Sequence, residues 1–144
     1  MTKTHIIIHH SLTPDGKTVD WNAIWNYHTK TLGWSSIGYH WGLEDIAGRL
    51  QVLRGRPTDC DGAHSLEFNK NGIGICCVGN FDVQVPTMEL YNLLSDFCKW
   101  LMGLYGIPKE NVLGHGEGQK MLGVKDFKTC PGKMFNMDQL RRML

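Results

Sequence analysis

The sequence of 144 residues has little charge imbalance and no long apolar run at its start, and each of these absences excludes a class of protein. Near the amino terminus only three consecutive isoleucines occur, at 6–8, far fewer than a secretory signal or a membrane span requires. Fifteen basic and 14 acidic residues give a formal net charge of +1, without a run of either sign. We therefore expect neither a membrane span nor a nucleic acid partner.

The cysteines also lack the pattern of a secreted, disulfide-rich protein. Their number is odd, no C-x-x-C pair occurs, and they stand at 60, 76, 77, 98 and 130. We expect free thiols and a reducing compartment. No repeat, linker or low-complexity segment divides the chain, and its length suits one hydrophobic core, so we expect a single domain over residues 1–144.

Hydrophobic patterning predicts alternating strands and helices. The expected strands are 4–10, a hairpin within 37–55, 72–81 and 111–115, and the expected helices are 20–32, 87–105 and 136–144. A glycine-rich stretch without a predicted element joins His115 to Cys130. The pattern indicates an α/β domain with a small mixed β-sheet flanked by helices.

Two adjacent histidines end the first predicted strand, just before a Pro14-Asp15-Gly16 turn. Neighbouring residues of a strand point to opposite faces of the sheet. At most one of His9 and His10 can therefore contribute its side chain to a given site.

Three short stretches place a nitrogen or sulfur ligand where an apolar segment gives way to a loop: "IIHHS" at 7–11, "LGHGEG" at 113–118 and "FKTCPG" at 127–132. Two imidazoles and a thiolate suit Zn²⁺, with a fourth position left for water as in catalytic sites. A chain with seven histidines and five cysteines also produces such a trio by chance. From spacing alone, a metal site and unrelated side chains remain alternatives.

These stretches, together with "GYHWGLEDIAGRL" at 38–50, "GAH" at 62–64 and "GIGICCVGNF" at 72–81, resemble the type 2 N-acetylmuramoyl-L-alanine amidases. That family of zinc amidases includes phage lysozymes of the amidase kind and the peptidoglycan recognition proteins. The resemblance runs from Ile6 to about Gly132, with the motifs in family order. It implies the zinc ligands His9, His115 and Cys130.

The resemblance also implies how the remaining site residues act. Tyr39 and Lys128 match the two catalytic side chains of the phage branch, and His64 and Asn69 match positions that line the substrate groove. A loop-closing structural role is the alternative for Asn69. The implied reaction is zinc-dependent hydrolysis of the amide bond between the lactyl group of N-acetylmuramic acid and L-alanine in peptidoglycan, as in a phage or prophage endolysin.

One motif departs from the family, because His115-Gly116-Glu117 stands where many relatives have His-Arg-Asp. We expect the longer carboxylate of Glu117 to orient a ligand or a loop in the same way. The alternatives to the enzyme are a non-catalytic peptidoglycan- or muropeptide-binding protein of the same fold, and a protein whose metal is structural. We expect a monomer made in the cytoplasm without a signal peptide, which acts on the cell wall after release or on wall fragments in the cytoplasm.

Overall fold

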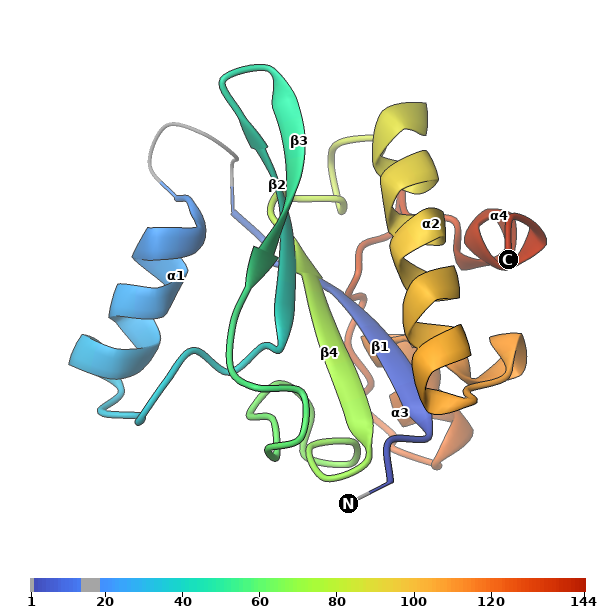
Figure 1. Ribbon diagram of the computed structural model, residues 1–144, viewed down its shortest axis with the longest axis horizontal. Helices are drawn as coiled ribbons and strands as arrows, with labels where there is room; N and C mark the ends of the chain where they lie inside the picture. Colours follow the sequence, from blue (N-terminus) through green and yellow to red (C-terminus); the bar gives the residue numbers. More distant parts are fainter. Residues whose placement is uncertain (1, 14–18) are drawn as a thin grey trace.

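A five-stranded mixed sheet forms the centre of the molecule (Figure 1). The computed structural model describes residues 2–13 and 19–144, so the Pro14-Asp15-Gly16 turn lies outside the described residues. The strands are β1 (His5–His10), β2 (Trp41–Ile46), β3 (Arg49–Arg54), β4 (Gly72–Cys77) and β5 (Val112–Gly114), in the order β3-β2-β4-β1-β5. Only β3 runs antiparallel to its neighbour among these strands. The predicted α/β class with a small mixed sheet is confirmed.

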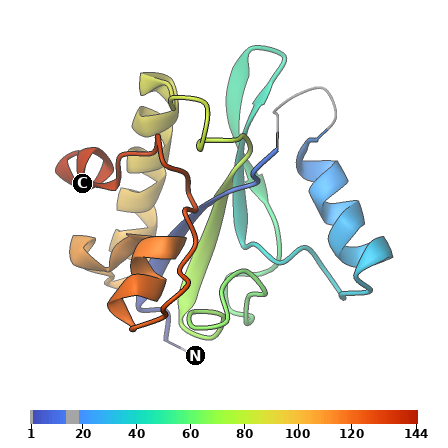
Figure 2. The same cartoon turned by 180° about the vertical axis from the view of Figure 1, so that it is seen from behind.

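Helices lie on both sides of this sheet, as Figures 1 and 2 show from opposite directions. The long helix α2 (Met88–Tyr105) and the short α4 (Met137–Arg142) lie on one side, and α1 (Trp21–Asn26) lies on the other. Helix α3 (His115–Met121) follows β5 directly and packs against β1 and β5. A π-helical turn (Tyr27–Thr31) and a 3₁₀ turn (Lys109–Asn111) complete the regular structure of the described chain. No helix in this part of the chain combines the length and apolar composition needed to cross a bilayer.

Strand β1 is buried on both faces, which is why it reads as a continuous apolar run. Ile6 and Ile8 belong to the large core that α2 covers, whereas Ile7 packs with Phe68 and Leu113 on the opposite face. All three isoleucines are fully buried. The same alternation sends the two following histidines to opposite faces.

Helix α2 begins and ends where the sequence predicts. The Thr87 side chain accepts a hydrogen bond from the backbone N–H of Leu90, and Gly106 ends the helix in the left-handed region. Leu94 and Leu101 are fully buried against the sheet, but Leu104, in the last turn of the helix, is 59% exposed.

Several predicted elements differ from the structure in extent or type, and β5 and α4 are each shorter than the predicted ranges 111–115 and 136–144. The α-helical part of 20–32 ends at Asn26 and gives way to the π-helical turn, and the predicted strand 72–81 ends at Cys77. The hairpin begins only at Trp41, with Ala47 and Gly48 at its turn, both with positive φ.

The largest correction concerns the glycine-rich stretch after His115, where the structure has helix α3 in place of a loop. A Cβ at Gly116 would lie 1.7 Å from the carbonyl oxygen of Lys128, and a Cβ at Gly118 would lie 2.7 Å from the Phe68 ring. These glycines allow a helix to pack closely against its neighbours, so they do not mark an irregular loop.

Candidate metal centre

His9, His115 and Cys130 meet at the end of β1. One potential ligand atom of each lies within 4.8 Å of those of the other two. Strands β1 and β5 are parallel neighbours, with Ile8 opposite Gly114, so the residues that follow them emerge side by side. Cys130 arrives from the segment after α3, where its carbonyl oxygen accepts a hydrogen bond of 2.8 Å from the backbone N–H of Gly116. The structure thus brings together the three predicted ligands.

The geometry of this group fits zinc. The Nδ1 atom of His9 lies 3.6 Å from the Sγ atom of Cys130. Tetrahedral zinc, with bonds of about 2.0 Å to nitrogen and 2.3 Å to sulfur, separates such atoms by about 3.5 Å. Two imidazoles and one thiol leave a fourth position for water or substrate, which is the donor set of a catalytic site.

Burial sets the charge of all three groups. It lowers the pKa of His9 well below its usual value and lowers the pKa of His115 to about 4, so both imidazoles are neutral at pH 7. Burial also raises the pKa of Cys130 to about 12, so without metal the thiol keeps its proton and metal binding must release it. The nearby Lys128 ammonium makes a smaller contribution that lowers the pKa of each of the three groups. Lys128 itself is exposed at the mouth of the site.

Tyr39 lies beside the same group. Its ring centroid is 5.2 Å from that of His9. Burial, with smaller contributions from Cys76 and Cys130, raises the pKa of Tyr39 well above its usual value. The phenol therefore keeps its proton and remains a hydrogen-bond donor. The next residue, His40, uses both ring nitrogens elsewhere, since Nδ1 accepts from the Gly74 N–H and Nε2 donates to the Cys60 carbonyl.

His64 and Asn69, the two residues expected to line the substrate groove, lie beside the metal group, in the loop before β4. They line an open groove of about 420 Å³ together with His115 and Lys128. The side-chain oxygen of Asn69 accepts hydrogen bonds from the backbone N–H groups of His64 (2.8 Å) and Ser65 (3.0 Å), so Asn69 closes its own loop. His64 contacts His9 directly, with 3.0 Å between His64 Nδ1 and His9 Nε2.

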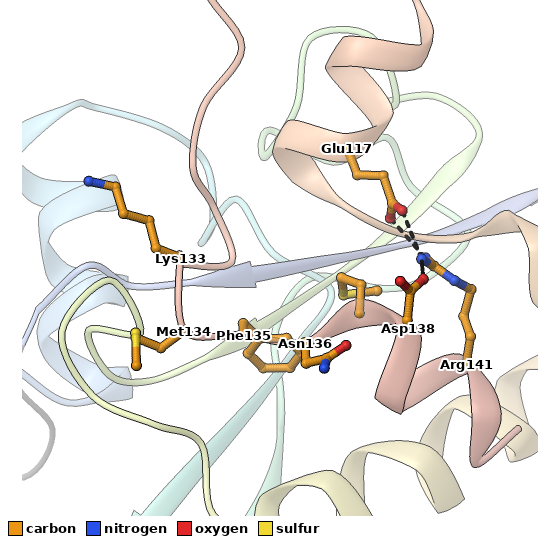
Figure 3. Close-up of a pocket in the computed structure, with 8 residues that line it drawn as sticks. Glu117, Lys133, Met134, Phe135, Asn136, Asp138 and Arg141 are labelled. Carbon is orange, nitrogen blue, oxygen red and sulfur yellow. Dashed lines mark hydrogen bonds and ion pairs between the residues drawn. The ribbon is translucent and has the colours of Figure 1, made fainter.

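Glu117 stabilises the start of α3. None of its hydrogen bonds within the described residues reaches a side chain of the three candidate ligands. Its carboxylate accepts from the backbone N–H of Gly114 at 3.1 Å and from two guanidinium nitrogens of Arg141, each at 2.8 Å. Figure 3 shows this ion pair, with Arg141 also reaching Asp138 at 2.6 Å. Glu117 therefore connects α4 to the junction between β5 and α3, where His115 lies. This contact is how Glu117 fulfils the expected role of orienting a loop.

Sequence reasoning missed Gln119. Its side-chain oxygen accepts from the backbone N–H of Lys128 at 3.0 Å, and its nitrogen donates to Glu67 at 3.3 Å. The spacing of four from His115 puts both residues on one face of a helix, but this signal is readable only once α3 is recognised as a helix.

A family model and curated relatives match most of this chain. The family model described as N-acetylmuramoyl-L-alanine amidase matches residues 1–133. Peptidoglycan-recognition protein LB of Drosophila melanogaster is 27% identical over 139 residues, covering 91% of this chain and 56% of that protein. The human N-acetylmuramoyl-L-alanine amidase is 29% identical over 120 residues, covering 76% of this chain and 20% of that protein. The chain thus spans about half of the first relative and a fifth of the second.

Solved structures of similar proteins have the same fold. The N-acetylmuramoyl-L-alanine amidase LysC from Clostridium intestinale superposes with a TM-score of 0.78 at 26% identity, covering 98% of this chain and 84% of that one. The Ph2119 endolysin from a Thermus scotoductus bacteriophage gives 0.76 at 21% identity, over 99% and 85%. Because the family model matches residues 1–133 of this 144-residue chain, the chain belongs to the N-acetylmuramoyl-L-alanine amidase family.

Proposed function

We propose that this chain is a zinc-dependent peptidoglycan hydrolase of the endolysin kind, which cleaves the amide bond between the lactyl group of N-acetylmuramic acid and L-alanine. The observation that carries the proposal is the cluster of His9, His115 and Cys130 next to an open groove. Membership of the amidase family and the likeness to the Clostridium amidase support it.

The residues around the cluster suit amide hydrolysis. Zinc held by the three ligands would supply Lewis acidity and a water of lowered pKa. The neutral phenol of Tyr39 donates a hydrogen bond to the carbonyl oxygen of the scissile bond as negative charge develops there. The Lys128 ammonium, at the mouth of the site, stabilises the same charge. The groove beside His115 holds the substrate, with Asn69 keeping the wall of the groove in place.

The test is digestion of purified peptidoglycan, with mass spectrometry of the soluble products, in the presence of zinc and after chelation. We expect free stem peptides that begin with L-alanine, released only with metal. Cys130→Ser should abolish this release, whereas the matched control Cys60→Ser, which changes an exposed free thiol, should leave it unchanged. Release of the same peptides by the chelated protein or by Cys130→Ser would contradict the zinc mechanism.

The second candidate is binding without cleavage, which the similarity to peptidoglycan-recognition proteins supports. It predicts that muropeptides bind in calorimetry and are recovered intact, with or without zinc. The presence of all three ligands in one cluster favours the hydrolase.

A further inference from the structure

The imidazole of His9 is engaged at both nitrogens. Nδ1 faces the Sγ atom of Cys130 at 3.6 Å, and Nε2 lies 3.0 Å from Nδ1 of His64. A neutral imidazole carries a single N–H, so a metal at Nδ1 requires the proton to be on Nε2. That proton then points at His64, which must accept it.

The surroundings of the His64 ring suit its role as this hydrogen-bond acceptor. If Nδ1 accepts, the proton of the neutral ring lies on Nε2, which is buried without a hydrogen bond of good geometry, and the Gly72 backbone is the hydrogen-bond partner near the ring. The Nδ1 atom of His64 faces His9, so neither ring nitrogen is open to a molecule in the groove.

Two glycines confine the His64 ring. A Cβ at Gly62 would lie 2.3 Å from Cδ2 of His64, and a Cβ at Gly74 would lie 2.5 Å from the same atom. Real Cβ atoms do not approach other atoms this closely, so the ring occupies space that only glycine leaves free. The close fit fixes the direction in which Nδ1 points.

We propose that His64 is a positioning residue of the metal centre: its Nδ1 accepts a hydrogen bond from Nε2–H of His9 and so fixes the tautomer and orientation that present His9 Nδ1 to the metal. This inference rests on the proposed function in one respect, namely that His9 is a zinc ligand. It gives His64 a role other than the substrate contact expected from the sequence. Hydrogen bonds of this kind to metal-binding histidines change metal affinity by about 10- to 100-fold in known sites.

The test compares two substitutions that differ in the acceptor. His64→Leu keeps much of the side-chain volume and removes the acceptor, whereas His64→Asn places an oxygen near the position of Nδ1. Zinc affinity is measured by competition with a chromophoric chelator, and the absorption spectrum of the Co²⁺ form reports ligand geometry. We expect His64→Leu to weaken zinc binding by about 10- to 100-fold and to alter the Co²⁺ spectrum, and His64→Asn to bind zinc within about threefold of wild type.

His5→Leu is the matched control, because His5 lies at the other end of β1, where its ring packs against Phe68. It should leave zinc affinity unchanged. Wild-type affinity in His64→Leu would overturn the positioning role while leaving the amidase proposal intact, and so would an equal loss in His64→Leu and His64→Asn. A wild-type protein that binds no zinc would instead overturn the proposed function.

A second measurement needs no variant and covers the case in which His64→Leu does not fold. Long-range ¹H–¹⁵N correlation spectra of the zinc-bound wild type report which ring nitrogens carry protons. We expect protons on Nε2 of both His9 and His64 and none on Nδ1 of His64. A proton on Nδ1 of His64 would overturn the proposal.

Discussion

His9 and His10 are adjacent histidines that the sheet puts to different uses. The His9 ring lies 4.6 Å from that of His115, centroid to centroid, within the metal group. His10 faces the other side of the sheet, where its Nδ1 accepts a hydrogen bond of 3.0 Å from the backbone N–H of Phe81. The expectation that at most one of the pair serves the site follows from strand geometry and agrees with the structure.

Tyr39→Phe is the sharpest test of a single side chain at the site. The substitution removes a hydroxyl that stays protonated because burial raises the pKa of Tyr39. We expect kcat to fall by about 10²- to 10³-fold, as for loss of one oxyanion donor, with zinc affinity unchanged. Steady-state kinetics on soluble muropeptides and a zinc titration measure the two quantities.

Tyr105→Phe, at the end of α2, is the control and should retain full activity. Activity of Tyr39→Phe within about twofold of wild type would remove Tyr39 from the mechanism, since loss of an oxyanion-hole donor costs far more.

At the scale of elements, α3 holds the segment that carries Lys128 and Cys130. Its first turn contacts the segment through the N–H of Gly116, and its next turn contacts it through Gln119. The segment therefore depends on a helix that the sequence pattern did not predict.

Gly116→Ala tests this dependence. The new Cβ would meet the Lys128 carbonyl oxygen at 1.7 Å, so helix and segment must move apart. We expect the free energy of unfolding to fall by about 1–3 kcal/mol, as for other overpacked sites, and zinc affinity to fall with it. Urea unfolding and zinc competition measure both.

Gly103→Ala in α2 is a matched control, because nothing lies within 4 Å of the added Cβ. There alanine should stabilise the helix by up to about 1 kcal/mol. A Gly116→Ala protein with unchanged stability and unchanged zinc affinity would show that the segment does not depend on close packing with α3.

At the scale of the whole molecule, all seven histidines are harder to protonate in the folded chain than in the unfolded one. Burial is the largest cause at each position, namely His5, His9, His10, His28, His40, His64 and His115. Below about pH 6.5 the unfolded chain binds protons that the folded chain does not, so stability falls as the pH falls.

We therefore predict that the metal-free protein loses much of its stability between pH 7 and pH 5. A buried histidine such as His40, with its pKa near 4, contributes a loss of about 2 kcal/mol over that interval. Urea unfolding in the presence of a chelator measures the change. The change between pH 7 and pH 7.5 should be far smaller, because the histidines are then almost neutral in both states, and equal stability at pH 5 and pH 7 would contradict the prediction.

The sequence by itself determined the strand β1, the helix α2 and the mixed α/β class, because these depend on local periodicity, and its resemblance to the amidase family implied the three candidate ligands. Only the tertiary structure decided that α3 is a helix, that Gln119 holds Lys128, and that both nitrogens of His64 face inward. Those features depend on which atoms meet across long stretches of chain. A glycine that permits close packing and a glycine that loosens a loop look the same in a sequence, and only the neighbouring atoms distinguish them.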